Sequence, residues 1–319
     1  MIEVNNLVKR YGNHTAVDHL SFKIEKGKIY GFLGPNGAGK STTMNMITGY
    51  IASTEGTVKI DGHDILEEPE AAKKCIGYLP EQPPVYFDMT VLEYMKFVAD
   101  LKKIPKDKKA NMIEEVMDMV KISDMRNRLI KNLSKGYRQR VGLAEAIMGY
   151  PEVIILDEPT VGLDPKQIIE IRKLISALRH EHTIILSTHI LQEVNAVCST
   201  VAVINKGKLA ASGSVSDFTA SEGTVNKFVI NIVGGSGKSE SQKVLQSVDG
   251  VRRVDFVRVD KDAFIFNVES ERKSDVRRGV FNAVAHANMA VIELRPVGRT
   301  LEEIFIEIVS KEQSSAETD

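Results

Sequence analysis

The order of apolar and polar positions divides the chain into segments with strand and helix patterns. Residues 2–8 alternate apolar and polar side chains, as a strand with one buried face does. Residues 153–156 are all apolar, and residues 183–187 have the apolar centre Ile-Ile-Leu, which is typical of parallel strands that are buried on both faces. Over residues 90–132 the apolar positions recur instead at helical spacing. These patterns predict an α/β fold with a helical insertion at about residues 88–150.

The composition changes in the last third of the chain. Residues 212–223 are rich in serine, glycine and threonine, which predicts that a first domain of residues 1–215 ends there. Beyond this boundary, strand and helix patterns follow one another in an order that predicts a small α+β domain of ferredoxin-like type over 216–310. We expect a last amphipathic helix at 301–309 and a disordered tail at 311–319.

A phosphate-binding motif stands near the start of the chain. The sequence G-P-N-G-A-G-K-S at residues 34–41 fits the pattern G-x-x-x-x-G-K-[ST], and it follows a strand pattern and precedes a helix pattern. Glycines let backbone N–H groups surround a phosphate, and the helix N-terminus adds partial positive charge. Lys40 can reach the terminal phosphates, and the Ser41 hydroxyl can hold a magnesium ion. The expected nucleotide-binding residues of this loop are Gly34, Pro35, Asn36, Gly37, Ala38, Gly39, Lys40, Ser41 and Thr42.

A shorter segment, G-S-G-K-S at residues 235–239, resembles this loop superficially. It has Ile232 where the first glycine of the motif should stand, and the sequence gives no strand–loop–helix setting for it. We therefore expect a flexible turn there.

Two predicted strands end in residues with catalytic chemistry. The strand at 153–156 runs into Asp157 and Glu158: the first acid can hold magnesium, and the second can orient and polarise an attacking water. The strand at 183–187 leads to His189, a candidate contact of the γ-phosphate, although a single histidine is more often structural. Upstream, Tyr11 either stacks on a nucleotide base or caps a sheet edge, and the sequence leaves both interpretations open.

Charge and composition narrow the class of protein. The 319 residues contain 42 Lys+Arg and 43 Asp+Glu, a formal charge of −1 that gives no reason to expect nucleic-acid binding. The two cysteines, Cys75 and Cys198, lie far apart and in no metal-ligand spacing. We find no signal-peptide pattern and no run of about 18 apolar residues, so we expect no membrane span and a cytoplasmic location.

The ordered set of motifs resembles the ATP-binding subunit of an ABC transporter over about residues 1–215. Such a resemblance implies a P-loop NTPase fold with a RecA-like core and a helical subdomain. Residues 34–41 resemble the Walker A motif, 154–158 Walker B, Gln82 the Q-loop glutamine, 133–137 the signature, 161–164 the D-loop, His189 the switch histidine and Tyr11 the A-loop aromatic.

The resemblance also implies cofactors, partners and roles. It implies that two ATP-binding subunits pair head to tail, so that ATP and Mg²⁺ lie between Walker A of one subunit and Ser134, Gly136 and Asp164 of the other. A separate transmembrane permease would hold the pair at the cytoplasmic side of the membrane. The implied catalytic residues are Lys40, Gln82, Glu158 and His189, and the implied metal-binding residues are Ser41, Gln82 and Asp157.

The signature departs from the family pattern. It reads Leu-Ser-Lys-Gly-Tyr at residues 133–137, where the family usually has Leu-Ser-Gly-Gly-Gln. Ser134 and Gly136 are kept, so a phosphate contact remains feasible. Together with Gly-Tyr-Leu-Pro-Glu at residues 77–81 and the small C-terminal domain, this variant resembles the exporters of antibiotic, sodium and gliding-motility type.

Two alternatives belong to other functional classes. A soluble ABC-type ATPase acting on ribosomes or DNA usually carries two ATP domains in one chain or a long coiled coil, and neither is found in this sequence. A non-enzymatic nucleotide sensor would not need Asp157, Glu158 and His189 together. ATP hydrolysis coupled to transport through a separate permease is therefore the expected function.

Overall fold

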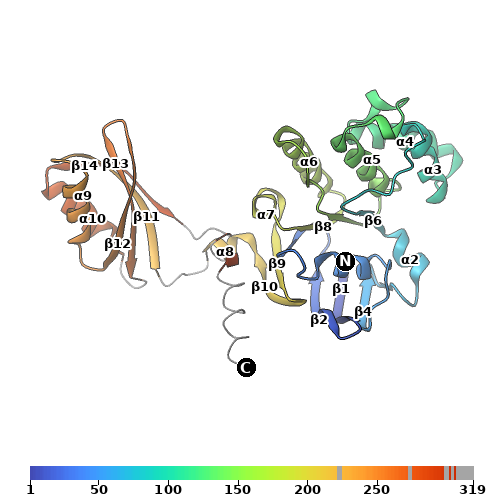
Figure 1. The fold of residues 1–319 in the computed structure, drawn as a ribbon, viewed down its shortest axis with the longest axis horizontal. Helices are drawn as coiled ribbons and strands as arrows, with labels where there is room; N and C mark the ends of the chain where they lie inside the picture. Colours follow the sequence, from blue (N-terminus) through green and yellow to red (C-terminus); the bar gives the residue numbers. More distant parts are fainter. Residues whose placement is uncertain (221–224, 272–274, 298–301, 303–304, 307–319) are drawn as a thin grey trace. The chain divides into compact units, whose positions relative to one another are not determined.

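The fold is described from a computed structural model that covers residues 1–220, 225–271 and 275–297, with Glu302, Phe305 and Ile306 (Figure 1). Contacts along the chain separate a larger unit, which contains Met1–Val215, from a smaller unit within Ser216–Ile304. The last helix expected at 301–309 and the tail expected at 311–319 lie outside the described residues, apart from the three named above.

A six-stranded sheet, with strand order β10-β9-β3-β8-β7-β6, forms the centre of the larger unit. Both faces of its middle strands are buried, because alternate side chains enter different cores: Ile154 and Leu156 pack with the helices, Val153 and Ile155 with the second sheet. The parallel strands are β3 (Ile29–Leu33), β6 (Ile76–Leu79), β7 (Val153–Asp157), β8 (Thr183–Thr188) and β9 (Thr200–Asn205), and β10 (Lys208–Ser214) is antiparallel.

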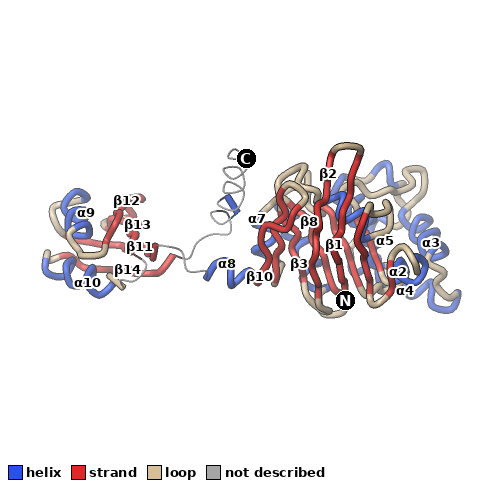
Figure 2. Tube along the Cα trace, turned by 90° about the horizontal axis from the view of Figure 1, so that it is seen from below, coloured by secondary structure: helices blue, strands red, loops and turns tan. Residues whose placement is uncertain are grey.

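An antiparallel sheet, with strand order β2-β1-β4-β5, covers one side of this sheet (Figures 1 and 2). Helix α1 (Lys40–Ile47) shares a core with it, in which Met44 of α1 packs with Val4 and Phe32. That packing fixes the helix behind the phosphate-binding motif. The strands are β1 (Ile2–Tyr11), β2 (His14–Ile24), β4 (Glu55–Ile60) and the two-residue β5 (His63–Asp64).

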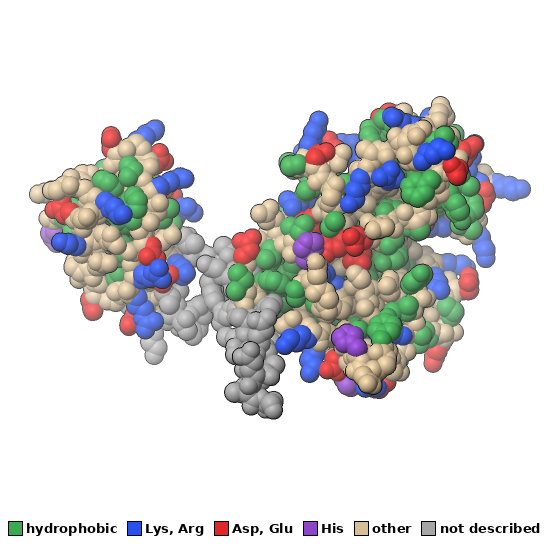
Figure 3. All heavy atoms as spheres, viewed as in Figure 1, with side chains coloured by type: hydrophobic (Ala, Val, Ile, Leu, Met, Phe, Trp, Pro, Cys, Tyr) green, Lys and Arg blue, Asp and Glu red, His purple; other side chains and the backbone are tan. Residues whose placement is uncertain are grey.

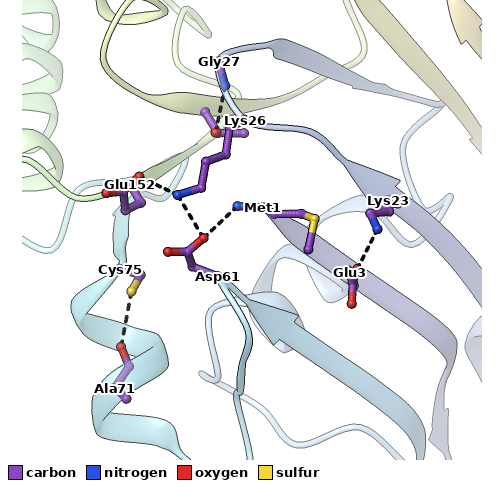
Figure 4. Close-up of polar contacts among 10 residues, drawn as sticks. Met1, Glu3, Lys23, Lys26, Gly27, Asp61, Ala71, Cys75 and Glu152 are labelled. Atoms are coloured by element: carbon purple, nitrogen blue, oxygen red, sulfur yellow. Dashed lines mark hydrogen bonds and ion pairs between the residues drawn. The ribbon is translucent and has the colours of Figure 1, made fainter.

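Polar contacts join the loops at the amino ends of the parallel strands (Figure 4). The ammonium nitrogen of Lys26 lies 3.1 Å from Asp61 Oδ1 and 3.4 Å from Glu152 Oε2. Next to it, the Gly27 amide donates a hydrogen bond of 3.2 Å to the Thr183 hydroxyl. Because Lys26 is largely exposed, each ion pair contributes little to stability. The contacts connect the loops before β3 and β7 with the turn after β4.

The helices begin where the sequence provides caps. Thr90 and Glu93 form a capping box at the start of α3, Ser134 caps α5 through the Tyr137 amide, and Asp164 caps α6. Helices α3 to α5 lie together at one end of the larger unit (Figure 1), as expected for the helical insertion. The helices are α2 (Pro69–Lys74), α3 (Val91–Leu101), α4 (Lys106–Met119), α5 (Lys135–Ile147), α6 (Pro165–Leu178) and α7 (Leu191–Val197), with 3₁₀ turns at Ser123–Met125 and Ile130–Asn132.

The smaller unit is a four-stranded antiparallel sheet with the order β12-β13-β11-β14. Helices α9 and α10 pack on one face, where Phe228, Phe266 and Val280 form the core. The element order βαββαβ is that of ferredoxin-like domains. After α8 (Val215–Ala220), the elements are β11 (Val225–Gly234), α9 (Lys238–Gln246), β12 (Val251–Asp260), β13 (Ala263–Glu271), α10 (Arg277–His286) and β14 (Met289–Val297).

One expectation about this unit was wrong. Residues 235–237 do connect a strand to a helix, because β11 ends at Gly234 and α9 begins at Lys238. The error arose because the first four residues of α9, Lys-Ser-Glu-Ser at 238–241, are polar and give no apolar pattern that would place the start of the helix at Lys238.

Candidate functional site

The loop between β3 and α1 requires glycine at specific positions. Gly37 and Gly39 have φ angles of 79° and 99°, in the left-handed region that favours glycine. A Cβ atom at Gly34 would lie 2.4 Å from the carbonyl oxygen of Ile204, and one at Gly39 would lie 2.5 Å from that of Ala16. The loop is therefore held closely between neighbouring backbone segments.

Lys40, the first residue of α1, folds its side chain back over this loop. Its ammonium nitrogen donates hydrogen bonds to the carbonyl oxygens of Gly34 (2.8 Å) and Pro35 (3.2 Å), and it lies 3.9 Å from Glu158 Oε1. The side chain is only 6% exposed. Burial lowers the pKa of Lys40, whereas the negative charges of Glu158 and Asp157 act in the opposite direction. The ammonium group of Lys40 is thus buried against the loop.

The two acids at the end of β7 lie in different surroundings. Asp157 is 4% exposed, and its Oδ1 atom has no hydrogen-bond partner among the described residues. Glu158 has a φ angle of 49°, and its amide donates a 2.9 Å hydrogen bond to the Ser187 carbonyl of β8. Its Oε1 atom lies 2.8 Å from His189 Nδ1. The turn after β7 therefore directs the second carboxylate towards the histidine that follows β8.

A cavity of about 580 Å³ lies over the loop. On the face shown in Figure 3, acidic side chains and a histidine of the larger unit are exposed beside one another. Nine of the residues expected from the sequence line this cavity. They are Tyr11, Asn36, Gly37, Gly39, Lys40, Ser41, Thr42, Glu158 and His189. Tyr11 is 52% exposed, so its ring is accessible to a ligand.

Comparison with known proteins gives the family. A family model described as ABC transporter matches residues 17–161. The bacitracin transport ATP-binding protein BcrA of Bacillus licheniformis is 41% identical over 211 residues, which cover 66% of this chain and 68% of BcrA. The daunorubicin/doxorubicin resistance ATP-binding protein DrrA of Streptomyces peucetius is 30% identical over 322 residues, covering 100% of this chain and 95% of DrrA. The chain belongs to the ABC transporter family.

A solved structure agrees with this assignment. The dimeric structure of MJ0796, a bacterial ABC transporter cassette, matches with a TM-score of 0.62 and 25% identity, covering 67% of this chain and 98% of that one. The predicted fold class is confirmed, and this ABC protein binds and hydrolyses ATP. None of its described helices has the length and the apolar character needed to span a bilayer.

Other expected residues of this ABC protein lie outside the cavity. Gln82 is exposed, and Asp164 uses its carboxylate to accept a 2.9 Å hydrogen bond from the Gln167 amide. Ser134 caps α5, and Gly136 lines a second cavity, of about 460 Å³, with Tyr137. Four more expected residues do not line the first cavity: Gly34, Pro35 and Ala38 of the phosphate loop, and Asp157 at the end of β7.

Four residues that line the cavity were not among the expected site residues: His14, Ala16, Glu81 and Val161. His14 pairs with Tyr11 across the hairpin between β1 and β2. Apolar–polar alternation on both sides of Gly12 could have revealed this hairpin, and with it the neighbourhood of the two rings. Glu81 and Val161 belong to the segments 77–81 and 161–164, which resemble family motifs, although neither was expected as a contact. Ala16 belongs to no motif.

Proposed function

We propose that this ABC ATPase is the ATP-hydrolysing subunit of an exporter. It would work with a separate transmembrane permease and a second ATP-binding subunit, at the cytoplasmic side of the cell membrane. One observation carries the proposal: a single cavity collects the phosphate loop, Lys40, Glu158 and His189. The likeness to BcrA and DrrA, which are named for bacitracin transport and for daunorubicin/doxorubicin resistance, supports export.

The loop supplies the binding energy for the triphosphate. Backbone amides of residues 37–41 and the N-terminus of α1 would surround the β-phosphate, and Lys40 would exchange its two carbonyl contacts for phosphate oxygens. Its low exposure strengthens that interaction, because the charge acts in a medium of lower dielectric than water. The exposed ring of Tyr11 would stack on the base at the rim of the cavity.

Glu158 and His189 would carry the hydrolytic step. A water held by the Glu158 carboxylate gives its proton to that carboxylate as its oxygen attacks the γ-phosphorus. The Glu158 carboxylate accepts a hydrogen bond from His189 Nδ1, and this contact orients both side chains and places the ring where it could contact the γ-phosphate. The step yields ADP and inorganic phosphate.

The residues near the loop also fit a magnesium ion. The buried Oδ1 atom of Asp157 is unpartnered among the described residues, and the Ser41 hydroxyl lines the same cavity as the loop. Ser41, Asp157 and Gln82 would hold the ion. When bound, Mg²⁺ neutralises charge on the phosphate oxygens.

A second subunit would complete the site. Ser134 and Gly136 lie at the N-terminus of α5, a helix of 13 residues whose free amides could meet the γ-phosphate held by another ATP-binding subunit. Asp164, at the start of α6, would lie in the same interface. The dimeric MJ0796 cassette supports such a pairing.

A Glu158→Gln variant tests the catalytic assignment. It keeps the shape of the side chain but cannot accept the proton, so we expect ATP affinity to be retained and turnover to fall about a hundredfold or more. Glu152→Gln is a matched control, because Glu152 is exposed and precedes the opposite end of β7. Undiminished turnover by Glu158→Gln would remove Glu158 from its role. Recovery of an integral membrane protein with the affinity-tagged full chain tests the permease.

A further inference from the structure

A second buried carboxylate lies behind the catalytic pair. The Thr188 hydroxyl, at the end of β8, lies 2.8 Å from Glu193 Oε2 and 3.3 Å from Glu158 Oε2. The Thr188 oxygen in turn accepts a 3.1 Å hydrogen bond from the Ile190 amide. One threonine hydroxyl therefore stands between two carboxylates, of which Glu158 alone lines the cavity.

A hydroxyl has a single proton to donate. The shorter distance to Glu193 and the bond from the Ile190 amide direct that proton towards Glu193. The second oxygen of Glu158 then keeps its lone pairs, as an atom that takes a proton from water must. If Glu193 were absent, the same hydroxyl would turn to Glu158, where it would occupy a lone pair of the carboxylate and hold it in a different orientation.

The surroundings of Glu193 make a packing role a poor explanation. The Glu193 side chain is only 1% exposed, although glutamate is almost never fully buried without a partner. Burial raises the pKa of its carboxyl group, while the Thr188 hydrogen bond and the charge of Arg172 on α6 act in the opposite direction. Its Oε1 atom has no hydrogen-bond partner in the described part of the chain. An apolar side chain would fill the site at lower cost.

We infer that Glu193 is a positioning residue for ATP hydrolysis, which acts through the Thr188 hydroxyl to set the orientation of the Glu158 carboxylate. The inference rests on the proposed role of Glu158. Thr188 has a second effect, because its backbone leads directly into His189, whose ring binds the other oxygen of the same carboxylate. The two oxygens of the Glu158 carboxylate are thus contacted by two consecutive residues at the end of β8, Thr188 and His189.

The test measures kcat, KM and ATP affinity of the full chain. Thr188→Val, which keeps the shape but removes the hydroxyl, and Glu193→Ala should each lower kcat about 10- to 100-fold, with KM and ATP affinity within about twofold of the parent. Thr188→Ser should restore most of the rate, because it keeps the hydroxyl. The double variant should lose no more than the slower single variant, since both changes break one interaction.

A matched control removes a hydroxyl–carboxylate pair elsewhere. Tyr94→Phe deletes the 2.6 Å hydrogen bond to Glu145 in the helical insertion, and it should leave kcat unchanged. Two results would overturn the inference even if Glu158→Gln still blocks turnover. One is a wild-type kcat in Thr188→Val, and the other is a kcat loss in the double variant that equals the product of the two single losses. Turnover retained by Glu158→Gln would overturn the proposed function, and the inference with it.

Discussion

Two loops of this chain carry the pattern Gly-x-Gly-Lys-Ser, at residues 37–41 and 235–239, and each connects a strand to a helix. The first follows β3, whose five residues are all buried between parallel neighbours, and the second follows an antiparallel strand. The comparison teaches that the pattern alone does not create a phosphate site. The strands on either side decide what the loop can hold.

The two lysines show the difference most directly. Lys40 is buried and donates to the carbonyl oxygens of its own loop, and its ammonium nitrogen lies 3.9 Å from the carboxylate of Glu158, which follows β7. Lys238 is exposed, and its ammonium lies 4.1 Å from the centre of the Phe256 ring. A cation over an aromatic face contributes about 0.5–1 kcal/mol at an exposed site, so Lys238 stabilises its own unit.

The backbone amides differ in a similar way. In the second loop, the Ser236 amide donates to the carboxylate of Glu240, from the first turn of α9. An acid of the chain thus occupies the position where a phosphate oxygen would have to bind. The first loop has no acidic residue in the first turn of α1, so no carboxylate of that turn competes with an anion for the amides of the loop.

Replacing the two lysines in turn should give the largest contrast. Lys40→Ala removes the charge that contacts the terminal phosphates, and we expect ATP turnover to fall on the order of a hundredfold or more. Lys238→Ala is the matched control and should leave turnover at the parent value. A steady-state phosphate-release assay measures both. Equal losses in the two variants would show that the loops do not differ in function.

Glycine exchanges should give a smaller contrast. Gly39→Ala places a methyl group against the Ala16 carbonyl at a φ of 99°, so the loop must shift, and we expect ATP affinity to fall about tenfold or more. Gly237→Ala meets no atom within 4 Å, but its φ of 128° still strains an alanine by about 1–3 kcal/mol. Calorimetric titration should show the weaker ATP binding of Gly39→Ala, and denaturant unfolding should show the lower stability of Gly237→Ala. Weakened ATP binding by Gly237→Ala would contradict this division.

The smallest effect is expected at Glu240. Glu240→Gln keeps the shape of the side chain but weakens the hydrogen bond to the Ser236 amide, and it should lower the free energy of unfolding by about 0.5–1 kcal/mol. Urea denaturation measures that loss. The amide resonance of Ser236 should stay unchanged when inorganic phosphate is added to the variant. A phosphate-dependent shift would mean that the carboxylate alone keeps this loop from binding anions.

Much of the fold followed from the sequence because long patterns and caps agree with each other. The buried strands and the phosphate loop were predicted from local chemistry, and the helices that follow Thr90, Ser134 and Asp164 begin at residue types that cap helices well. Helices α2 and α7 were missed because six or seven residues are too few for a periodic pattern. Without α7, nothing in the sequence indicated that Glu193 lies behind Glu158.

The residues of the site that were not predicted reach it through tertiary contacts. His14 arrives by strand pairing, and Ala16 is placed by the close approach of its carbonyl to Gly39. The hairpin could be recognised from the alternation around Gly12, whereas nothing in the spacing along the chain indicates the approach of Ala16 to Gly39. The roles of Gln82, Ser134, Gly136 and Asp164 stay predictions, because they depend on a ligand and a second subunit.

The left-handed backbone at Glu158 constrains how an inactive form of the enzyme should be made. At a φ of 49°, a valine or threonine would be forced against its own main chain, and the turn between β7 and the following loop would have to open. Loss of activity in such a variant would reflect a distorted backbone and would say nothing about the chemistry of the carboxylate. Glutamine keeps the same outline and the same unbranched Cβ, so it separates loss of chemistry from loss of shape.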